Sequence, residues 1–289
     1  ATHIKLGVLA IRQPGLFLHD VNVYWETFLT QISNAIEREF LDELARKARF
    51  LDESERLYKT LFNSISHELR IPVATIIGAS DSLLMTKHNK ETSDDLTHEI
   101  VKASVRLNRL IENLLNMSRI ESGHISPHLD WCDIRDLINT VIESLKEELR
   151  PFNLQVEIPD DMPLVKLDFG LIEQVLYNLA YNASSYAPPS SEIKVKAFYQ
   201  SGNFCLIVKD RGPGLRDENL SKIFQKFFKG SETKTGGIGL GLSIVKGFVE
   251  AHKGQIIAEN RKNGGTQFII RIPSEIPDLN IPNNGEDNT

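Results

Sequence analysis

Cysteine is scarce in this sequence, which contains only Cys132 and Cys205, far apart and without CxxC spacing. That scarcity excludes a thiolate zinc site and a disulfide framework, and it suits a reducing compartment. Basic residues are not in excess either, because 33 Lys and Arg stand against 39 Asp and Glu, for a net charge of -6. A chain of this charge offers no strong basic patch, so we expect no general binding of nucleic acid.

Long apolar runs are also missing. No run of 18 apolar residues occurs, and the N-terminus has no basic region followed by an apolar core, so we expect neither a membrane span nor a signal peptide within the chain. The chain begins without Met on "ATHIKLGVLAI", which already reads as a strand over residues 4–11, and we expect it to be a fragment of a longer protein. Its 289 residues allow two ordinary domains, or one domain with a long helical extension.

Apolar residues in the first half follow a helical repeat that begins near Asn22. Two stretches alternate steps of four and three residues, the spacing of helices that wrap around each other. The first contains Leu44, Ala48, Leu51, Glu55, Tyr58, Phe62, Ile65 and Leu69, of which all but Glu55 are apolar, and the second contains Leu96, Ile100, Ala103, Leu107, Leu110, Leu114 and Met117. The polar "TKHNKE" joins them, and "TSDD" offers N-cap candidates for the second helix. The pattern predicts a helical hairpin, which needs a second copy to cover its apolar seam as a dimeric four-helix bundle.

The second half has a different pattern. Between residues 131 and 272, predicted helices alternate with predicted strands, which indicates an α+β fold with an α/β sandwich after the long-helix hairpin. The expected helices are 134–149, 169–185 and 240–252, and the expected strands are 154–158, 193–199, 204–209, 255–259 and 266–272. From Ser274 onward the chain is rich in Pro, Asn and acidic residues, so we expect disorder there.

His67 is the first candidate for chemistry. It lies about 200° around a helix from Ile65 and Leu69, and so it faces away from the seam. Glu68 follows it, and Pro72 lies one turn further on. The local pattern permits two interpretations, an exposed histidine beside a proline kink or an accessible imidazole that takes a phosphoryl group on one ring nitrogen.

Asparagine and glycine clusters in the second half favour phosphate and metal binding. Asn178 and Asn182 lie one helical turn apart, and two such amides can hold a hydrated Mg²⁺. Asp210 precedes Gly212 and Gly214 in a DxGxG pattern that alone most often marks a turn. A stronger cluster, "GGIGLG" at 236–241, crowds the start of a helix, where free N–H groups favour phosphate. A flexible loop precedes it rather than a strand, and no GxxxxGK[ST] occurs, so neither a Rossmann site nor a P-loop is expected.

In order and spacing these motifs resemble the kinase core of bacterial sensor histidine kinases. The chain contains an H-box "SISHELRIP", an N-box "QVLYNLAYNASSY", glycine boxes "DRGPG" and "GGIGLGLSIV", an F-box "IFQKFF" and "GGTQF", over roughly residues 55 to 272. The resemblance implies a Bergerat-type ATP-binding domain with ATP and Mg²⁺, a homodimer, and a response regulator receiver domain as partner.

The same resemblance implies a role for each site residue. His67 would accept the phosphoryl group and Glu68 would hydrogen-bond or deprotonate it, Asp210 would bind the adenine amino group, and Asn182 would ligate Mg²⁺. The implied nucleotide-binding residues are Asn178, Asn182, Tyr186, Asp210, Gly212, Gly214, Lys229, Gly237, Gly239, Leu240, Gly241, Leu242 and Thr266, with residues 231–236 as a lid that also contains Lys234.

Two departures from the family pattern bear on mechanism. Ser185 stands where a basic residue usually precedes the N-box Tyr, so one phosphate contact is missing or is made by Lys229 or Lys234. Ile71 stands four residues after the histidine, where Thr or Asn commonly orients a water, and we expect weak phosphatase activity. A kinase-dead dimeric scaffold and a hydrolytic ATPase remain alternatives, although Asn178 occupies the position of the usual hydrolytic Glu.

The domain boundaries follow from these motifs. We expect the tail of a GAF-type sensor domain and its exit helix over 1–40, a signalling helix and phosphotransfer hairpin over 41–126, an ATP-binding domain over 127–274 and a disordered tail over 275–289. A GAF tail before a kinase hairpin resembles the KdpD-type kinases. This resemblance implies the cytoplasmic portion of an inner-membrane receptor, anchored only through segments outside this chain.

Overall fold

The computed structural model describes residues 19–85, 89–123, 125–228 and 238–277. The predicted strand 4–11, Lys229, Lys234, Gly237 and most of the predicted disordered tail lie outside these residues. The chain divides into two units, Ala1–Ile65 and Ser66–Thr289, and each is described by itself. Among the described residues, no helix is both long and apolar enough to cross a membrane.

The first unit contains most of helix α1 (His19–Met85), which continues as one helix through Pro72 into the second unit. Of the predicted seam residues whose side chains are described in this unit, Leu44, Ala48 and Phe62 are exposed and Ile65 is half-buried. An amphipathic helix gains most of its stability from burying its apolar face, so this seam needs a partner that a single copy does not supply.

In the second unit the end of α1 and helix α2 (Lys90–Glu121) form the predicted hairpin. The N-cap is Asn89, whose side-chain oxygen accepts a hydrogen bond from the backbone N–H of Thr92 at 2.8 Å. The predicted cap within "TSDD" is therefore wrong, because the helix begins one turn earlier and these residues lie inside it. The predicted seam of α2 does face inward, with Ala103, Leu110 and Met117 buried.

The remainder of this unit is a sandwich of helices against a sheet. A five-stranded sheet has the order β2-β4-β5-β7-β6, with β2 parallel to β4 and the other neighbours antiparallel, and β1 pairs with β3 in a separate ribbon. The strands are β1 (Asp130–Cys132), β2 (Asn153–Glu157), β3 (Val165–Leu167), β4 (Glu192–Gln200), β5 (Asn203–Lys209), β6 (Gln255–Asn260) and β7 (Thr266–Pro273). The helices are α3 (Ile134–Ser144), α4 (Lys146–Leu149), α5 (Phe169–Tyr186) and α6 (Gly241–Ala251), with a short 3₁₀ turn, η1 (Asp217–Asn219).

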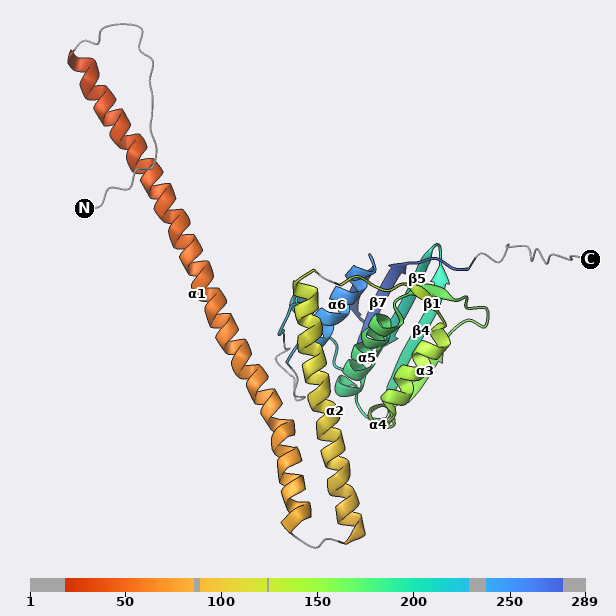
Figure 1. Ribbon diagram of the computed structural model, residues 1–289. Coiled ribbons are helices and arrows are strands. Elements are labelled where there is room, and N and C mark those ends of the chain that lie inside the picture. The colour runs from red at the N-terminus through yellow and green to blue at the C-terminus, as the bar shows by residue number, and fades with distance from the viewer. Residues whose placement is uncertain (1–18, 86–88, 124, 229–237, 278–289) are drawn as a thin grey trace, which may run out of the picture. The chain divides into compact units, whose positions relative to one another are not determined.

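Helices α3, α5 and α6 cover one face of the five-stranded sheet (Figure 1). In β4 the side chains alternate between buried and half-buried, with Ile193, Val195 and Ala197 pointing to the helices. The core between the layers also contains Leu176 and Phe248, both almost fully buried. Cys132 and Cys205 are buried free thiols.

The predicted fold class is confirmed, and most predicted elements lie within two residues of the observed ones. The predicted helix 134–149 is interrupted at Leu145, whose φ of -107° ends α3 before α4 begins. The β1–β3 ribbon was not predicted, because strands of three residues are too short to show an alternating pattern. Asp168 is the N-cap of α5, since its Oδ1 accepts a hydrogen bond from the N–H of Leu171 at 3.1 Å.

Candidate nucleotide site and phosphoacceptor helix

His67 lies exposed on α1, as the helical pattern predicted. Glu68 instead points into the hairpin, where its side chain is 9% exposed and its Oε2 accepts a hydrogen bond from Nη2 of Arg106 on α2 at 3.1 Å. Among the described residues, no hydrogen bond joins Glu68 to His67. The structure therefore places the carboxylate in an ion pair with the second helix of the hairpin, an arrangement that the sequence analysis missed.

The two asparagines lie one turn apart in the second half of α5. Asn178 is buried, and its Nδ2 donates to the carbonyl of Gln174 at 3.0 Å, which leaves Oδ1 as an acceptor. That oxygen faces α6, because a Cβ on Gly241 would lie 3.3 Å from it. Asn182 is half-buried one turn further along. The N-box and the second glycine box are thus brought together across the domain.

The second glycine box requires its glycines for steric reasons. Gly239 has φ of +76°, and a Cβ there would lie 2.7 Å from the carbonyl oxygen of Phe228 in the F-box segment. The N–H of Phe227 donates to the Gly239 carbonyl at 2.9 Å. Leu240 is buried at the start of α6 and Leu242 is half-buried in its first turn. This close packing holds the first turn of α6, which contains free N–H groups of the kind that bind phosphate.

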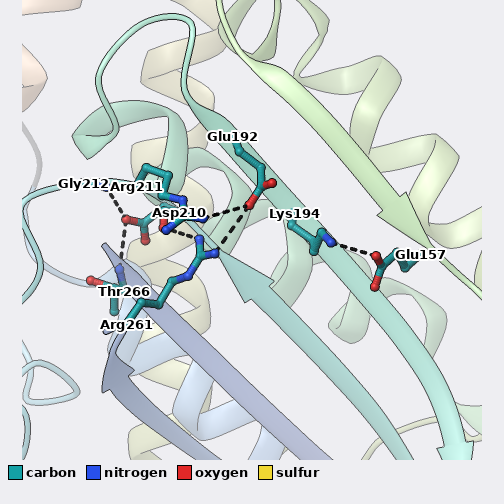
Figure 2. A network of polar contacts seen from close by, with 8 residues as sticks. All are labelled: Glu157, Glu192, Lys194, Asp210, Arg211, Gly212, Arg261 and Thr266. Carbon is teal, nitrogen blue, oxygen red and sulfur yellow. Dashed lines mark hydrogen bonds and ion pairs between the residues drawn. The ribbon is translucent and has the colours of Figure 1, made fainter. Parts of the chain in front are cut away.

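Asp210 is the most tightly held residue of the candidate site. Its Oδ1 accepts hydrogen bonds from the N–H groups of Gly212 at 2.7 Å and Thr266 at 3.1 Å (Figure 2). Its own N–H donates to the carbonyl of Thr266 at 3.0 Å. Oδ1 is therefore committed to the protein, and Oδ2 is the oxygen available to accept a hydrogen bond from a ligand.

Burial raises the pKa of Asp210 above its ordinary value, because an ionised carboxylate loses hydration inside the protein. The two backbone donors and the positive charge of Arg261 act in the opposite direction. The Asp210 carboxyl group is therefore costly to ionise, although the two backbone N–H groups and Arg261 stabilise the ionised form.

The first glycine box also meets the end of α5. A Cβ on Gly212 would lie 3.1 Å from the carbonyl oxygen of Tyr186, and the Tyr186 side chain is 43% exposed. Gly214 has φ of +80° and lies against Asn260. The N-box and both glycine boxes, with Thr266, therefore line one region of the domain, whereas Lys229 and Gly237 lie outside the described residues.

Sequence reasoning missed a set of polar residues behind Asp210. Arg261 Nη1 donates to the Asp210 carbonyl at 2.7 Å, while Arg261 Nη2 and Arg211 Nη2 lie 3.4 and 3.8 Å from Oε1 of Glu192 (Figure 2). Asn260 exchanges two hydrogen bonds with the backbone of Leu215, at 2.7 and 2.6 Å. The only sequence signal was the polar "ENRKNGG" turn, which reads as ordinary exposed loop.

Helix α2 contacts the α/β sandwich at residues of the N-box itself. The guanidinium of Arg109 lies over the rings of Tyr177 and Tyr181, 4.3 and 5.0 Å from their centroids. Nearby, Asn116 donates to Oε1 of Gln174 at 3.0 Å. Cation–π contacts of this kind contribute about 0.5–2 kcal/mol. The helix that contains both asparagines is therefore one of the helices that the hairpin touches; α6 is another, because the Ser243 hydroxyl lies 3.8 Å from the sulfur of Met117 on α2.

The donors in this region fit a magnesium ion bound together with a nucleotide. Among the described residues, no three His, Cys, Asp or Glu side chains gather as a metal site. Asn178 retains a free amide oxygen, and Asn182 lies on the same helical face. Neutral oxygens suit Mg²⁺, which keeps several waters and commonly takes its charged ligands from phosphates.

Family comparisons agree with this geometry. Residues 58–123 match the model described as "His Kinase A (phospho-acceptor) domain", and residues 168–276 match "Histidine kinase-, DNA gyrase B-, and HSP90-like ATPase". The first match contains His67 and Glu68. The second contains the N-box, both glycine boxes and Thr266, and so it assigns these motifs to an ATP-binding domain.

Individual relatives extend the likeness to nearly the whole chain. It is 34% identical over 277 residues to Sensor protein KdpD of Clostridium acetobutylicum and 32% identical over 279 residues to Sensor protein KdpD of Escherichia coli, with 94% and 92% of this chain covered. The chain spans 31% and 30% of the length of these relatives. The structure of histidine kinase ThkA in complex with response regulator protein TrrA is 27% identical, with a TM-score of 0.52, over 72% of this chain and 59% of that one. The chain thus belongs to the sensor histidine kinases, the phosphotransferases of two-component signalling, and within them it is similar to KdpD.

Proposed function

We propose that this chain autophosphorylates His67 from ATP and passes the phosphoryl group to an aspartate of a response regulator. The observation that carries the proposal is that the N-box contacts both glycine boxes, at Gly241 through Asn178 and at Gly212 through Tyr186, in a chain that also presents an exposed histidine on a hairpin. In the first step a ring nitrogen of His67 bonds to the γ-phosphorus as the bond to the bridging oxygen breaks, and ADP leaves with the electron pair.

Each residue of the nucleotide site has a proposed task. Asp210 accepts the adenine amino group on Oδ2, and the first turn of α6 donates backbone N–H groups to the phosphates. Asn182, supported by Asn178, holds Mg²⁺, which neutralises charge on the phosphates. Tyr186 packs against the base, and Lys229 neutralises charge on the phosphoryl group.

Glu68 remains the proposed base for the His67 imidazole. Because Glu68 is paired with Arg106, its carboxylate must first leave Arg106 and turn toward the imidazole before it can take the ring proton. Glu68 is buried, but it is one residue away on the same helix, and a change of rotamer that moves its carboxylate out of the hairpin would bring it toward the ring.

The proposed partners are a second copy of the chain and a receiver domain. Exposed apolar side chains remain on the hairpin of a single copy, notably Ile77 on α1 and Val101 and Val105 on α2. Exposed apolar side chains on a helical hairpin favour an interface, and a two-fold bundle would bury them. The ThkA–TrrA complex supports a response regulator as the second partner. We expect a sedimentation mass of about twice that of one chain.

Incubation with γ-labelled ATP and Mg²⁺ tests the kinase proposal. We expect label that is stable in base and lost in acid, as for a phosphoramidate, and that is absent from His67→Ala. His98→Ala serves as the matched control, because His98 is also an exposed helical histidine of the hairpin, and it should label as the wild type does. ATP binding without label would favour the kinase-dead scaffold, and steady release of phosphate without labelled protein would favour the hydrolytic ATPase.

We also propose that the phosphatase activity of the chain is weak, because of the side chain of Ile71. Ile71 is 39% exposed one turn beyond His67 and has no side-chain group that can orient a water. We expect slow loss of phosphate from the phosphorylated response regulator in the presence of ADP, and a several-fold faster loss with Ile71→Thr. Val73→Thr is the control, because Val73 is 40% exposed on the same helix. Rapid loss with the wild-type chain, or equal acceleration by both variants, would contradict the proposal.

A further inference from the structure

Arg261 is a charged group that the proposed chemistry does not use, although it touches the residue proposed to read the base. It is the first residue after β6, and its side chain is only 16% exposed. Nη1 donates to the Asp210 carbonyl at 2.7 Å and Nη2 lies 3.4 Å from Oε1 of Glu192, which begins β4 (Figure 2). One guanidinium thus joins the end of β5 to the start of β4.

The turn between β6 and β7 holds Arg261 in this position. The N–H of Arg261 donates to the Gly265 carbonyl at 2.9 Å, and the N–H of Gly264 donates to the Arg261 carbonyl at 3.2 Å, which closes the turn. Gly265 is at φ of +94°, and a Cβ there would overlap the Asp210 carbonyl oxygen. The turn therefore lies in direct contact with the backbone of Asp210, and an arginine at its first position can reach that carbonyl.

Contacts from this turn flank the whole first glycine box. Arg261 and Thr266 hold Asp210 at its start, and Asn260 binds both backbone groups of Leu215 just after its end. Backbone hydrogen bonds at both ends fix a loop more effectively than contacts at one end, because the loop then loses its freedom to pivot. We infer that these hydrogen bonds at the two ends of the glycine box fix the direction in which Oδ2 of Asp210 points.

We propose that Arg261 is a positioning residue that orients Asp210 toward the adenine amino group, and that Glu192 orients Arg261 in turn. Arg261 thereby sets the affinity for adenine nucleotides and the discrimination against bases that lack an amino group at this position. The positive charge also helps to keep the Asp210 carboxylate ionised, which is the form that accepts from the amino group. This inference rests on the proposed role of Asp210 in nucleotide binding.

The test compares the dissociation constants of ATP and inosine triphosphate, which carries an oxo group in place of the adenine amino group. For the full chain with Arg261→Ala we expect about tenfold weaker binding of ATP and little change for inosine triphosphate, so that the selectivity ratio falls by nearly the same factor. Arg261→Lys should retain part of the selectivity, because one ammonium can donate to the Asp210 carbonyl but cannot bridge to Glu192 as the planar fork does. Lys262→Ala is the matched control, an exposed cation of the same turn, and it should leave both constants unchanged.

A general loss of folding would weaken both nucleotides together, and the selectivity ratio separates that outcome from a positioning role. If Arg261→Ala destabilises the chain too far for titration, Glu192→Gln gives the second measurement, with a smaller fall in the same ratio expected. An unchanged ratio in the measurable variant would overturn the inference. Asp210→Ala tests the underlying proposal separately. If this variant leaves the selectivity for ATP over inosine triphosphate unchanged, the proposed adenine contact of Asp210 is wrong. If the selectivity falls with Asp210→Ala but not with Arg261→Ala, only the positioning role of Arg261 is refuted.

Discussion

Asp210→Asn is expected to weaken ATP binding at least tenfold while raising the melting temperature of the ATP-binding domain. An asparagine Oδ1 can keep the hydrogen bonds from Gly212 and Thr266, so the local fold survives. The side-chain amide then presents N–H donors where the adenine amino group needs an acceptor, and a buried donor facing a donor costs about 1–3 kcal/mol. The same change removes an ionised group whose burial raises its pKa, and with it the free-energy cost of keeping that charge dehydrated.

The pH dependence of this stabilisation has a definite sign. Because the folded-state pKa of Asp210 is raised, the native state binds a proton more readily than the unfolded state does between the two pKa values. The unfolding free energy of the wild type therefore falls as pH rises through that window and then levels off. The advantage of Asp210→Asn should be largest near neutral pH and should shrink in acid below the unfolded-state pKa.

Calorimetric melting curves and ATP titrations on the same samples check both halves of this expectation. Asp217→Asn is the matched control, because Asp217 is an exposed aspartate of η1, and it should change neither quantity. Unaltered ATP affinity in Asp210→Asn would refute the adenine role, and a lower melting temperature at neutral pH would show that the carboxylate contributes more through its donors than it costs through burial.

Gly265→Ala is expected to abolish measurable ATP binding and to lower the unfolding free energy by about 3 kcal/mol or more. Gly265 is at φ of +94°, and its added Cβ would overlap the Asp210 carbonyl oxygen and lie 2.8 Å from Cα of Arg211. Both obstacles are backbone, so no side-chain rotation relieves them. The turn must move away from Asp210, and this movement breaks the pairing of Thr266 with Asp210.

Gly264→Ala separates the steric effect from backbone strain. Gly264 is at φ of +82°, and a Cβ there would meet nothing within 4 Å. It should cost only the strain of a left-handed alanine, about 1–2 kcal/mol, and leave ATP affinity near that of the wild type. Denaturant unfolding and nucleotide titration measure the unfolding free energy and the ATP affinity of both variants. If both quantities fall equally in Gly264→Ala and Gly265→Ala, the close approach of Gly265 to Asp210 is not the reason that a glycine is needed there.

The hairpin, the outward position of His67 and the order of the nucleotide motifs could be predicted because each depends on local spacing. A heptad pattern fixes which face of a helix is apolar, and Asp168 could be assigned as a cap from its place before an apolar helix. The partners of Glu68 and Asp210 could not be predicted in this way. Arg106 lies 38 residues from Glu68 and Arg261 lies 51 residues from Asp210, and only the tertiary register brings them together.

His252 shows the same limit in another form. It is buried at the end of α6, where Nδ1 lies 2.8 Å from the Phe248 carbonyl and Nε2 accepts from the N–H of Asp168 at 3.1 Å. These contacts require the neutral tautomer with hydrogen on Nδ1. The helical pattern alone gives His252 and His67 the same interpretation, and their different burial in the structure distinguishes the structural histidine from the proposed phosphoacceptor.

The two buried cysteines have a practical consequence for observing motion in this protein. Burial raises the pKa of both the Cys132 and the Cys205 thiol, so the reactive thiolate form is scarce at neutral pH and reagents have little access to it. A cysteine introduced at Ser118 of α2 or at Lys246 of α6, both exposed, should therefore be modified far faster than the native pair. Spin or fluorescent labels at these two positions can then report separation of the hairpin from the ATP-binding domain without removal of either natural cysteine.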